Sequence, residues 1–403
     1  MFFIFDDERL MNDKKRLLIV FNSFQLGGVA SSMLNLLREI SSKYEIDLLC
    51  FSHEGPMKEL IPRQVNILPT NKWLGILGDT QKLTMEKSKA LGIVRFLLRG
   101  LSMFIGSDVF RRIILKTYGH LNGYDYAISF THDLNHKIFC GGANRFVAEF
   151  TDAPQKITFV HCDFSKYGGN TKVERDYYHR FDRIACCSEG CKRVFDSCIP
   201  DLSSRTMVVR NCLDYSRIEQ GQTETVELFD KSSFNIVTVG RLSPEKGIDR
   251  ALKAIADVIK KYDGKFKWYI IGDGLQKDEI QNLIKELGLS ESVKLLGEKK
   301  NPYPYMKQAD LFFLPSLHEC APMVFEESLY LGIPVLATET ISVKEMIIDR
   351  NVGYICDNSF EGVRDGILFV LTHKEILEEY KENINKLSLN NNLAITQFEG
   401  LMD

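Results

Sequence analysis

The sequence lacks the long apolar runs of a membrane-spanning protein and the paired ligand motifs of a zinc protein. No uninterrupted apolar stretch in the 403 residues approaches the ~20 that a bilayer-spanning helix needs. The apolar start at 1–5 is too short for a signal peptide, and acidic residues follow it. The ten cysteines are scattered, and Cys187 and Cys191 have no second ligand pair at zinc spacing. We therefore expect reduced thiols, no metal site and a cytoplasmic protein.

The residues that are present indicate two globular α/β domains. A composition of 44% hydrophobic and 26% charged residues is typical of a soluble globular protein, and 403 residues suit two domains. Apolar runs that alternate with helix-length segments predict a doubly wound parallel sheet in each half. The predicted strands are 16–21, 46–51, 126–130, 157–161, 183–187 and 207–210 in the first half, and 235–239, 267–271, 293–296, 311–314, 335–337 and 352–355 in the second.

The predicted domain bounds follow from these runs. We assign 1–211 to one Rossmann-like domain and 231–384 to another, because the polar stretch 212–230 lacks strand and helix periodicity and is interpreted as a linker. Our hypothesis for 385–403 is a C-terminal helix that crosses back to the first domain. Open α/β sheets bind ligands at the carboxyl ends of their strands, so the two domains are expected to face a central cleft.

A basic loop follows the first predicted strand of the second half. It holds Arg241 and Lys246 among glycines, and a guanidinium and an ammonium at this spacing can converge on a diphosphate. No Gly-Lys-Ser/Thr follows, so the loop differs from a P-loop; a plain surface turn is the alternative. The next strand ends in Gly272, Asp273 and Gly274, whose glycines either allow a ligand to approach the backbone or only form a tight turn.

The strongest local signal surrounds the start of a helix near residue 322. Pro322 suits the first helical position, which leaves the N–H groups of Met323 and Val324 free to bind a phosphate. Glu319 precedes this helix and Glu327 lies more than one turn into it, so both carboxylates can face the cleft. One could hold a sugar and the other a ribose diol. A pair of acids favoured by the helix dipole is the alternative, and it leaves Glu319 unexplained.

Together these motifs resemble the family 4 glycosyltransferases, which have the GT-B fold. The resemblance rests on the basic loop, the glycine turn, Asn-Pro-Tyr at 301–303 and the Glu-x7-Glu pair, and it extends over nearly the whole chain. It implies that Arg241 and Lys246 neutralise the diphosphate of a nucleotide sugar. It also implies that Glu319 contacts the transferred sugar, that Glu327 binds the ribose, and that the anomeric configuration is retained.

The first domain carries part of the same resemblance. Gly27 and Gly28 resemble the loop that closes over the diphosphate and the sugar. His161, at the end of a predicted strand, resembles the family histidine at the sugar, and a core histidine is the alternative. Two positions depart from the family: Cys212 stands where glycine is usual, and 320–322 replace the frequent Gly or Ser start. Neither departure removes a charge from the expected site.

The resemblance implies transfer of a sugar from a nucleotide-diphosphate sugar, such as a UDP-sugar, to a glycan or lipid-linked acceptor in cell-surface polysaccharide biosynthesis. No Asp-x-Asp occurs in the chain, so we expect no cofactor and no divalent metal at the diphosphate. Fixed cations and the helix start would stabilise the leaving group instead. A nucleotide-sugar 2-epimerase and a non-catalytic partner subunit of a transferase are the alternatives. Nucleic-acid binding is not expected from a net charge of −3.

One segment, 87–116, breaks the alternating pattern. It is rich in Leu, Ile and Phe and holds seven basic residues against one acid. One interpretation is an interfacial helix on the inner face of the cell membrane, which would suit a lipid-linked acceptor and anionic lipids. The other is a set of helices packed on the sheet with solvated Lys and Arg on their outer faces.

Overall fold

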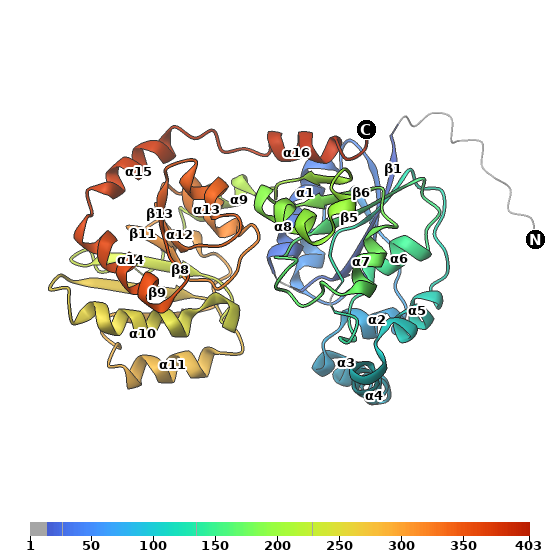
Figure 1. Ribbon diagram of the computed structural model, residues 1–403, viewed down its shortest axis with the longest axis horizontal. Coiled ribbons are helices and arrows are strands. Elements are labelled where there is room, and N and C mark those ends of the chain that lie inside the picture. Colours follow the sequence, from blue (N-terminus) through green and yellow to red (C-terminus); the bar gives the residue numbers. More distant parts are fainter. Residues whose placement is uncertain (1–13, 26, 134, 228) are drawn as a thin grey trace, which may run out of the picture. The chain divides into compact units, whose positions relative to one another are not determined.

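The computed structural model describes residues 14–25, 27–133, 135–227 and 229–403, which fall into two compact units. The first unit comprises the chain up to Cys187 with Lys192–Cys212 and Asn392–Asp403, and the second comprises Ser188–Cys191 and Leu213–Asn391. Each unit contains one parallel sheet with helices around it, which confirms the expected α/β class with two Rossmann-like domains (Figure 1).

The first sheet has seven parallel strands in the order β3-β2-β1-β4-β5-β6-β7. Leu17 of β1 lies opposite Ile46 of β2 on one side and Tyr126 of β4 on the other. The strands are β1 (Arg16–Ser23), β2 (Glu45–Ser52), β3 (Val65–Ile67), β4 (Tyr126–Ser129), β5 (Gln155–Val160), β6 (Arg183–Cys186) and β7 (Thr206–Val208).

Short polar residues precede the first turn of several helices in this unit. Asn71, Thr80 and Ser88 each accept a hydrogen bond from a backbone N–H of the following first turn, which satisfies a donor that has no partner within the helix. The helices are α1 (Gly28–Ile40), η2 (Pro56–Leu60), α2 (Lys72–Gly78), α3 (Gln81–Lys87), α4 (Lys89–Ile105), α5 (Asp108–Lys116), α6 (Ala143–Glu149), α7 (Lys172–Tyr178), η3 (Pro200–Leu202), α16 (Asn392–Glu399) and α8 (Glu189–Cys198), of which the first residues count with the second unit.

The C-terminal residues are part of the core of the first unit. Phe398 of α16 is fully buried in the same cluster as the inner face of α1 and alternate residues of β1 and β2. The Tyr126 hydroxyl donates to the carbonyl oxygen of Met402 at 2.6 Å, and Lys43 pairs with Glu399 at 2.6 Å.

The second sheet has six parallel strands in the order β10-β9-β8-β11-β12-β13. Its strands are β8 (Phe234–Val239), β9 (Phe266–Ile271), β10 (Val293–Gly297), β11 (Leu311–Leu314), β12 (Val335–Thr338) and β13 (Gly353–Cys356). Its helices are α9 (Tyr215–Gly221), η4 (Pro244–Lys246), α10 (Ile248–Ile259), α11 (Lys277–Glu286), α12 (Tyr303–Met306), α13 (Met323–Tyr330), η5 (Lys344–Ile348), α14 (Phe360–Thr372) and α15 (Ile376–Asn385).

Both faces of this second sheet are covered, which explains why its strands are continuous apolar runs. In β8, Ile236 faces the core formed with α10, α11 and α14, while its neighbour Val237 faces the core formed with α12 and α13. Alternate residues point to opposite faces of a sheet, so a strand buried on both faces needs apolar residues throughout. Helix α9 lies within 212–230, which was expected to be irregular; Ile218 is its one buried residue, too few to produce an apolar period.

Candidate functional site

Three loops meet at the carboxyl edge of the second sheet. They follow β9, β8 and β11, which are neighbours in the sheet. The amide of Gly240 donates to the carbonyl oxygen of Ile271 at 3.0 Å, and that of Leu242 donates to Asp273 at 2.9 Å. On the other side, the amide of Leu317 donates to the carbonyl oxygen of Glu245 at 2.8 Å. The backbone of the basic loop is therefore fixed on both sides.

Close packing between these loops accounts for two of the glycines. A Cβ atom on Gly274 would lie 2.2 Å from the carbonyl oxygen of Leu242, and one on Gly272 would lie 1.9 Å from that of Gly240. Gly247 has a φ of 62°, a left-handed conformation, and approaches the carbonyl oxygen of Pro315 in the same way. Tight backbone contact therefore explains Gly272 and Gly274 without a ligand.

Lys246 and Glu319 form an ion pair. The Lys246 Nζ donates to Glu319 Oε1 at 2.5 Å, and the Ser316 hydroxyl donates to the same oxygen at 2.7 Å. The two charged side chains are only 19% and 13% exposed. Sequence reasoning placed both residues in the site but did not pair them, and it missed Ser316.

Arg241 and Asp273 differ in their partners. Arg241 is exposed and takes part in none of the ion pairs among the described residues. Asp273 pairs with Lys277 at 2.5 Å and accepts from the amide of Gly274 at 2.7 Å, and the bond from Lys277 lowers the pKa of its carboxyl group. Arg241 is thus available to an anion, whereas Asp273 is engaged on the surface.

The helix start lies one residue later than expected. Helix α13 begins at Met323, and Pro322 is its N-cap in an extended conformation, so the prediction of Pro322 as the first helical residue is off by one position. The N–H groups of Met323 and Val324 are among the first of the helix, which have no acceptor within it. These two N–H groups remain candidates for binding an anion.

Glu327 has different partners from the Lys246–Glu319 pair. Burial raises the pKa of its carboxyl group to about 7, against the lowering effects of the Arg217 guanidinium and of a hydrogen bond from the Tyr303 hydroxyl. Tyr303 belongs to the Asn-Pro-Tyr motif, but Arg217 lies in the segment that was interpreted as a linker. No signal in the sequence pointed to Arg217.

The remaining predicted residues lie in the first unit. Gly27 precedes α1 and Gly28 is its first residue, and a Cβ atom on Gly28 would meet nothing within 4 Å. His161 directly follows β5 and is half-buried, with its ring centroid 5.1 Å from that of Phe130 and 5.7 Å from that of Phe159. These aromatic contacts also suit a histidine of the core.

The second unit matches a known protein family. Residues 220–387 match the family model described as glycosyl transferases group 1. The second unit is a group 1 glycosyl transferase domain. For this part of the chain the match confirms the resemblance to glycosyltransferases.

Curated relatives match part of this chain and part of their own length. An uncharacterised glycosyltransferase of Methanocaldococcus jannaschii is 32% identical over 169 residues, which are 40% of this chain and 41% of that protein. The Campylobacter jejuni N-acetylgalactosamine-N,N'-diacetylbacillosaminyl-diphospho-undecaprenol 4-alpha-N-acetylgalactosaminyltransferase is 35% identical over 176 residues, which are 43% of this chain and 46% of that protein. The chain thus spans less than half the length of these two relatives.

Solved structures resemble this chain over almost its whole length, beyond the glycosyl transferase domain. Anabaena HepE in complex with UDP and glucose has a TM-score of 0.67 at 16% identity, over 96% of this chain and 98% of its own. S. aureus TarM also has a TM-score of 0.67, at 14% identity, over 96% of this chain and 99% of its own. At these identities the similarity establishes the fold.

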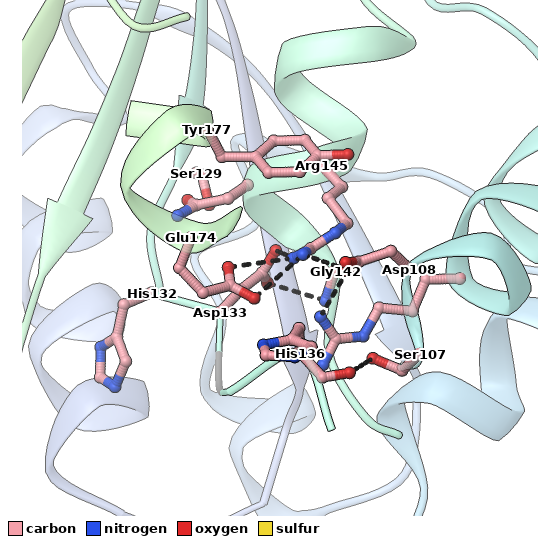
Figure 2. Close-up of polar contacts among 12 residues, drawn as sticks. Ser107, Asp108, Ser129, His132, Asp133, His136, Gly142, Arg145, Glu174 and Tyr177 are labelled. Atoms are coloured by element: carbon pink, nitrogen blue, oxygen red, sulfur yellow. Dashed lines mark hydrogen bonds and ion pairs between the residues drawn. The ribbon is translucent and has the colours of Figure 1, made fainter. Parts of the chain in front are cut away.

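A second cluster of charges lies outside the glycosyl transferase domain, in the first unit, and sequence reasoning missed it. The Arg145 guanidinium is 1% exposed and donates to Asp133 at 2.9 Å and to Glu174 at 3.0 Å. It also pairs with Asp108 and lies over the ring of Tyr177 (Figure 2). Although burial opposes it, these carboxylates raise the pKa of Arg145.

This buried cluster holds the loop between β4 and α6. Asp133 accepts from the amide of Gly142 at 2.9 Å, at the end of that loop. Arg111, fully buried on α5, donates to the carbonyl oxygen of Ile138 at 2.5 Å, and the backbone of Ser107 donates to His136 (Figure 2). The cluster thus ties α5, α6 and α7 to one loop.

Proposed function

We propose that the chain is a retaining glycosyltransferase that takes its sugar from a nucleotide-diphosphate sugar, with UDP as the nucleotide. The observation that carries this proposal is the gathering of Arg241, Lys246 and the α13 start at the carboxyl edge of a group 1 glycosyl transferase sheet. The structures of HepE with UDP support the choice of nucleotide.

In this proposal the site works by charge and position. Arg241, Lys246 and the N–H groups of Met323 and Val324 bind the diphosphate and stabilise the charge that develops on it as it leaves. Fixed cations perform this task, so the reaction needs no divalent metal. Gly272 and Gly274 act indirectly, because the lack of a Cβ atom lets the loop after β9 pack against the basic loop that holds the cations.

The carboxylates and the first unit have separate proposed roles. Glu319, held in place by Lys246 and Ser316, accepts hydrogen bonds from hydroxyls of the transferred sugar. Glu327 binds the ribose. Gly27 and Gly28 let the α1 start approach the donor, and His161 contacts the sugar.

The proposed acceptor is a glycan or a lipid-linked saccharide of cell-surface polysaccharide biosynthesis, reached at the inner face of the membrane. The name of the Campylobacter relative describes transfer to a diphospho-undecaprenol saccharide, which supports a lipid-linked acceptor. Among the described helices, none is long and apolar enough to cross a bilayer.

The test is a panel of UDP- and GDP-sugars screened for thermal stabilisation, with and without EDTA. A ligand that binds the native form raises its melting temperature. We expect stabilisation by a UDP-sugar that EDTA does not abolish, followed by transfer to a saccharide acceptor. No response to any sugar nucleotide contradicts the proposal, and a response lost with EDTA contradicts metal independence.

The two rival functions are distinguished by one further assay. Incubation with the donor alone would yield an epimer from a nucleotide-sugar 2-epimerase, whereas a transferase leaves the sugar configuration unchanged. A non-catalytic partner subunit would bind no donor. The ion pair between Lys246 and Glu319 and the exposed Arg241 favour the transferase, because a subunit without a donor has no use for them.

A further inference from the structure

Helix α4 buries a polar side and exposes an apolar side, the reverse of an ordinary amphipathic helix. The residues that it buries are Gly92, Arg95 and Ser102, which are small or charged. Seven of its large apolar side chains are exposed to solvent instead, while Leu91, Val94 and Leu98 are half-buried. A buried polar residue and an exposed large apolar patch are each more informative than a buried leucine, and here one helix has both.

Specific polar bonds fix this orientation. The Arg95 Nε donates to the carbonyl oxygen of Ile76 at 2.9 Å, and its Nη1 donates to Gln81 at 3.3 Å. The Gln81 side chain in turn donates to the carbonyl oxygen of Gly92 at 2.8 Å. A Cβ atom on Gly92 would lie 2.1 Å from the sulfur of Met85, so α3 and α4 pack closely at this point. Rotation of α4 to bury its apolar side would break these contacts.

The exposed side of α4 carries seven large apolar side chains, which we name, together with two on the neighbouring helix in sequence, the α4 face. Phe104 is 85% exposed, and α5 adds two exposed aliphatic side chains one helical turn apart. Exposure of so many large apolar side chains on one helix marks an interaction site. The α4 face consists of Ile93, Phe96, Leu97, Leu101, Met103, Phe104 and Ile105 of α4 with Val109 and Ile113 of α5.

The charges on the same two helices are almost all positive. Lys89 and Arg99 of α4 and Lys116 of α5 are exposed and take part in no ion pair among the described residues. Arg112 is also exposed, although it pairs with Glu149. A second copy docked on this face would bring these like charges together, which disfavours self-association. An anionic partner with an apolar interior matches both properties.

We propose that the α4 face inserts into an anionic phospholipid bilayer, with α4 lying along the plane of the membrane at the headgroup boundary. The side chains of the α4 face enter the acyl region, and Lys89, Arg99 and Lys116 contact lipid phosphates. This inference rests on the proposed function for its purpose, which is to bring the protein to a lipid-linked acceptor. The lipid contact itself is measured without any donor.

The test is co-sedimentation of the full chain with phosphatidylcholine vesicles that contain phosphatidylglycerol, and with vesicles of phosphatidylcholine alone. We expect binding to the anionic vesicles at low salt. The double variant Phe96→Asp/Phe104→Asp should lose it, while the matched control Ile348→Asp, at an exposed aliphatic residue of the second unit, should bind as the wild type does. Arg99→Glu should weaken partitioning by roughly fivefold or more, because one basic residue near an anionic surface contributes about that factor.

A second measurement reports insertion directly. Trp73 and the fully buried Trp268 are the two tryptophans of the chain, so Trp73→Phe/Phe104→Trp places a reporter on the α4 face. We expect a blue shift of its emission with anionic vesicles. Failure of the wild type to bind these vesicles, equal binding by the Phe96→Asp/Phe104→Asp variant, or a stable dimer without lipid would overturn the inference. Sugar-nucleotide stabilisation of the same variants, measured in solution, tests the proposed function separately.

Discussion

The two charge clusters of the molecule use opposite arrangements. In the first unit, Arg145 is buried and surrounded by three carboxylates, and every one of these contacts is internal. In the second unit, Lys246 has one carboxylate partner and Arg241 has none among the described residues. A buried charge must be matched, or its desolvation is not compensated. The first cluster is therefore built for stability, and the second leaves positive charge for a ligand.

The cluster around Arg145 should therefore contribute to stability, and the cluster of Lys246 and Arg241 to activity. Because Arg145 compensates two buried acids, Asp133 and Glu174, and a partly exposed one, Asp108, its loss should affect folding. The cations of the second cluster lie at the carboxyl edge of the sheet, and their positive charge exceeds that of their carboxylate partners. Their loss should therefore affect catalysis.

Arg145→Met should lower the free energy of unfolding by about 3–5 kcal/mol, since it leaves buried carboxylates without a cation. Urea-induced unfolding of the wild type and the variant measures this difference. The control is Arg180→Met, because the Arg180 side chain is 51% exposed and its guanidinium pairs with Glu149. This control should cost less than about 1 kcal/mol. Equal losses in the two variants would show that burial does not distinguish the two arginines.

Lys246→Met should lower the rate of sugar transfer by about 10²–10³-fold, as expected when one group that stabilises the leaving charge is removed. Its effect on the free energy of unfolding should be much smaller than that of Arg145→Met. Lys246→Arg keeps the charge and should retain more of the rate. Steady-state transfer assays and urea unfolding measure the two effects, and near-normal turnover of Lys246→Met would remove this residue from the proposed site.

Glu327 should make stability depend on pH in a defined window. Its folded pKa is about 7 against an ordinary value of 4.5, so between these values the unfolded chain has lost a proton that the folded chain retains. The free energy of unfolding should therefore fall as pH rises from about 4.5 to about 7 and then level off. Glu327→Gln should lack this contribution. Urea unfolding of both proteins across this range measures it, and parallel pH profiles would contradict the raised pKa.

The sequence predicted most strands of both sheets because a buried strand shows as an apolar run. Twelve apolar runs coincide with strands, since most of these strands are covered on both faces and need apolar residues on each. The exception is β3, whose three residues Val65–Ile67 form too short a run to show a period. Helix α9 was missed for a similar reason, because one buried residue makes no pattern.

The candidate site could be predicted in its members but not in its contacts. Arg241, Lys246 and Glu319 were recognisable from loops after strands, and the order of β8 and β11 in the sheet brings two of them together. The contribution of Arg217 could not be predicted from the sequence, because it depends on where α9 packs. Glu174 and Asp108 were also missed, since they lie 29 and 37 residues from Arg145 and in different helices.

The sequence by itself determined the two α/β units and the basic loop, because strand burial and turn chemistry are local properties of neighbouring residues. Only the tertiary structure decided which charges are matched inside and which remain free, because those contacts join residues far apart in the chain. It also decided the orientation of α4. The sequence of 87–116 left open whether the apolar side chains of this segment pack on the sheet or face a membrane, and the bonds of Arg95 to Ile76 and Gln81 hold the apolar side of α4 toward solvent.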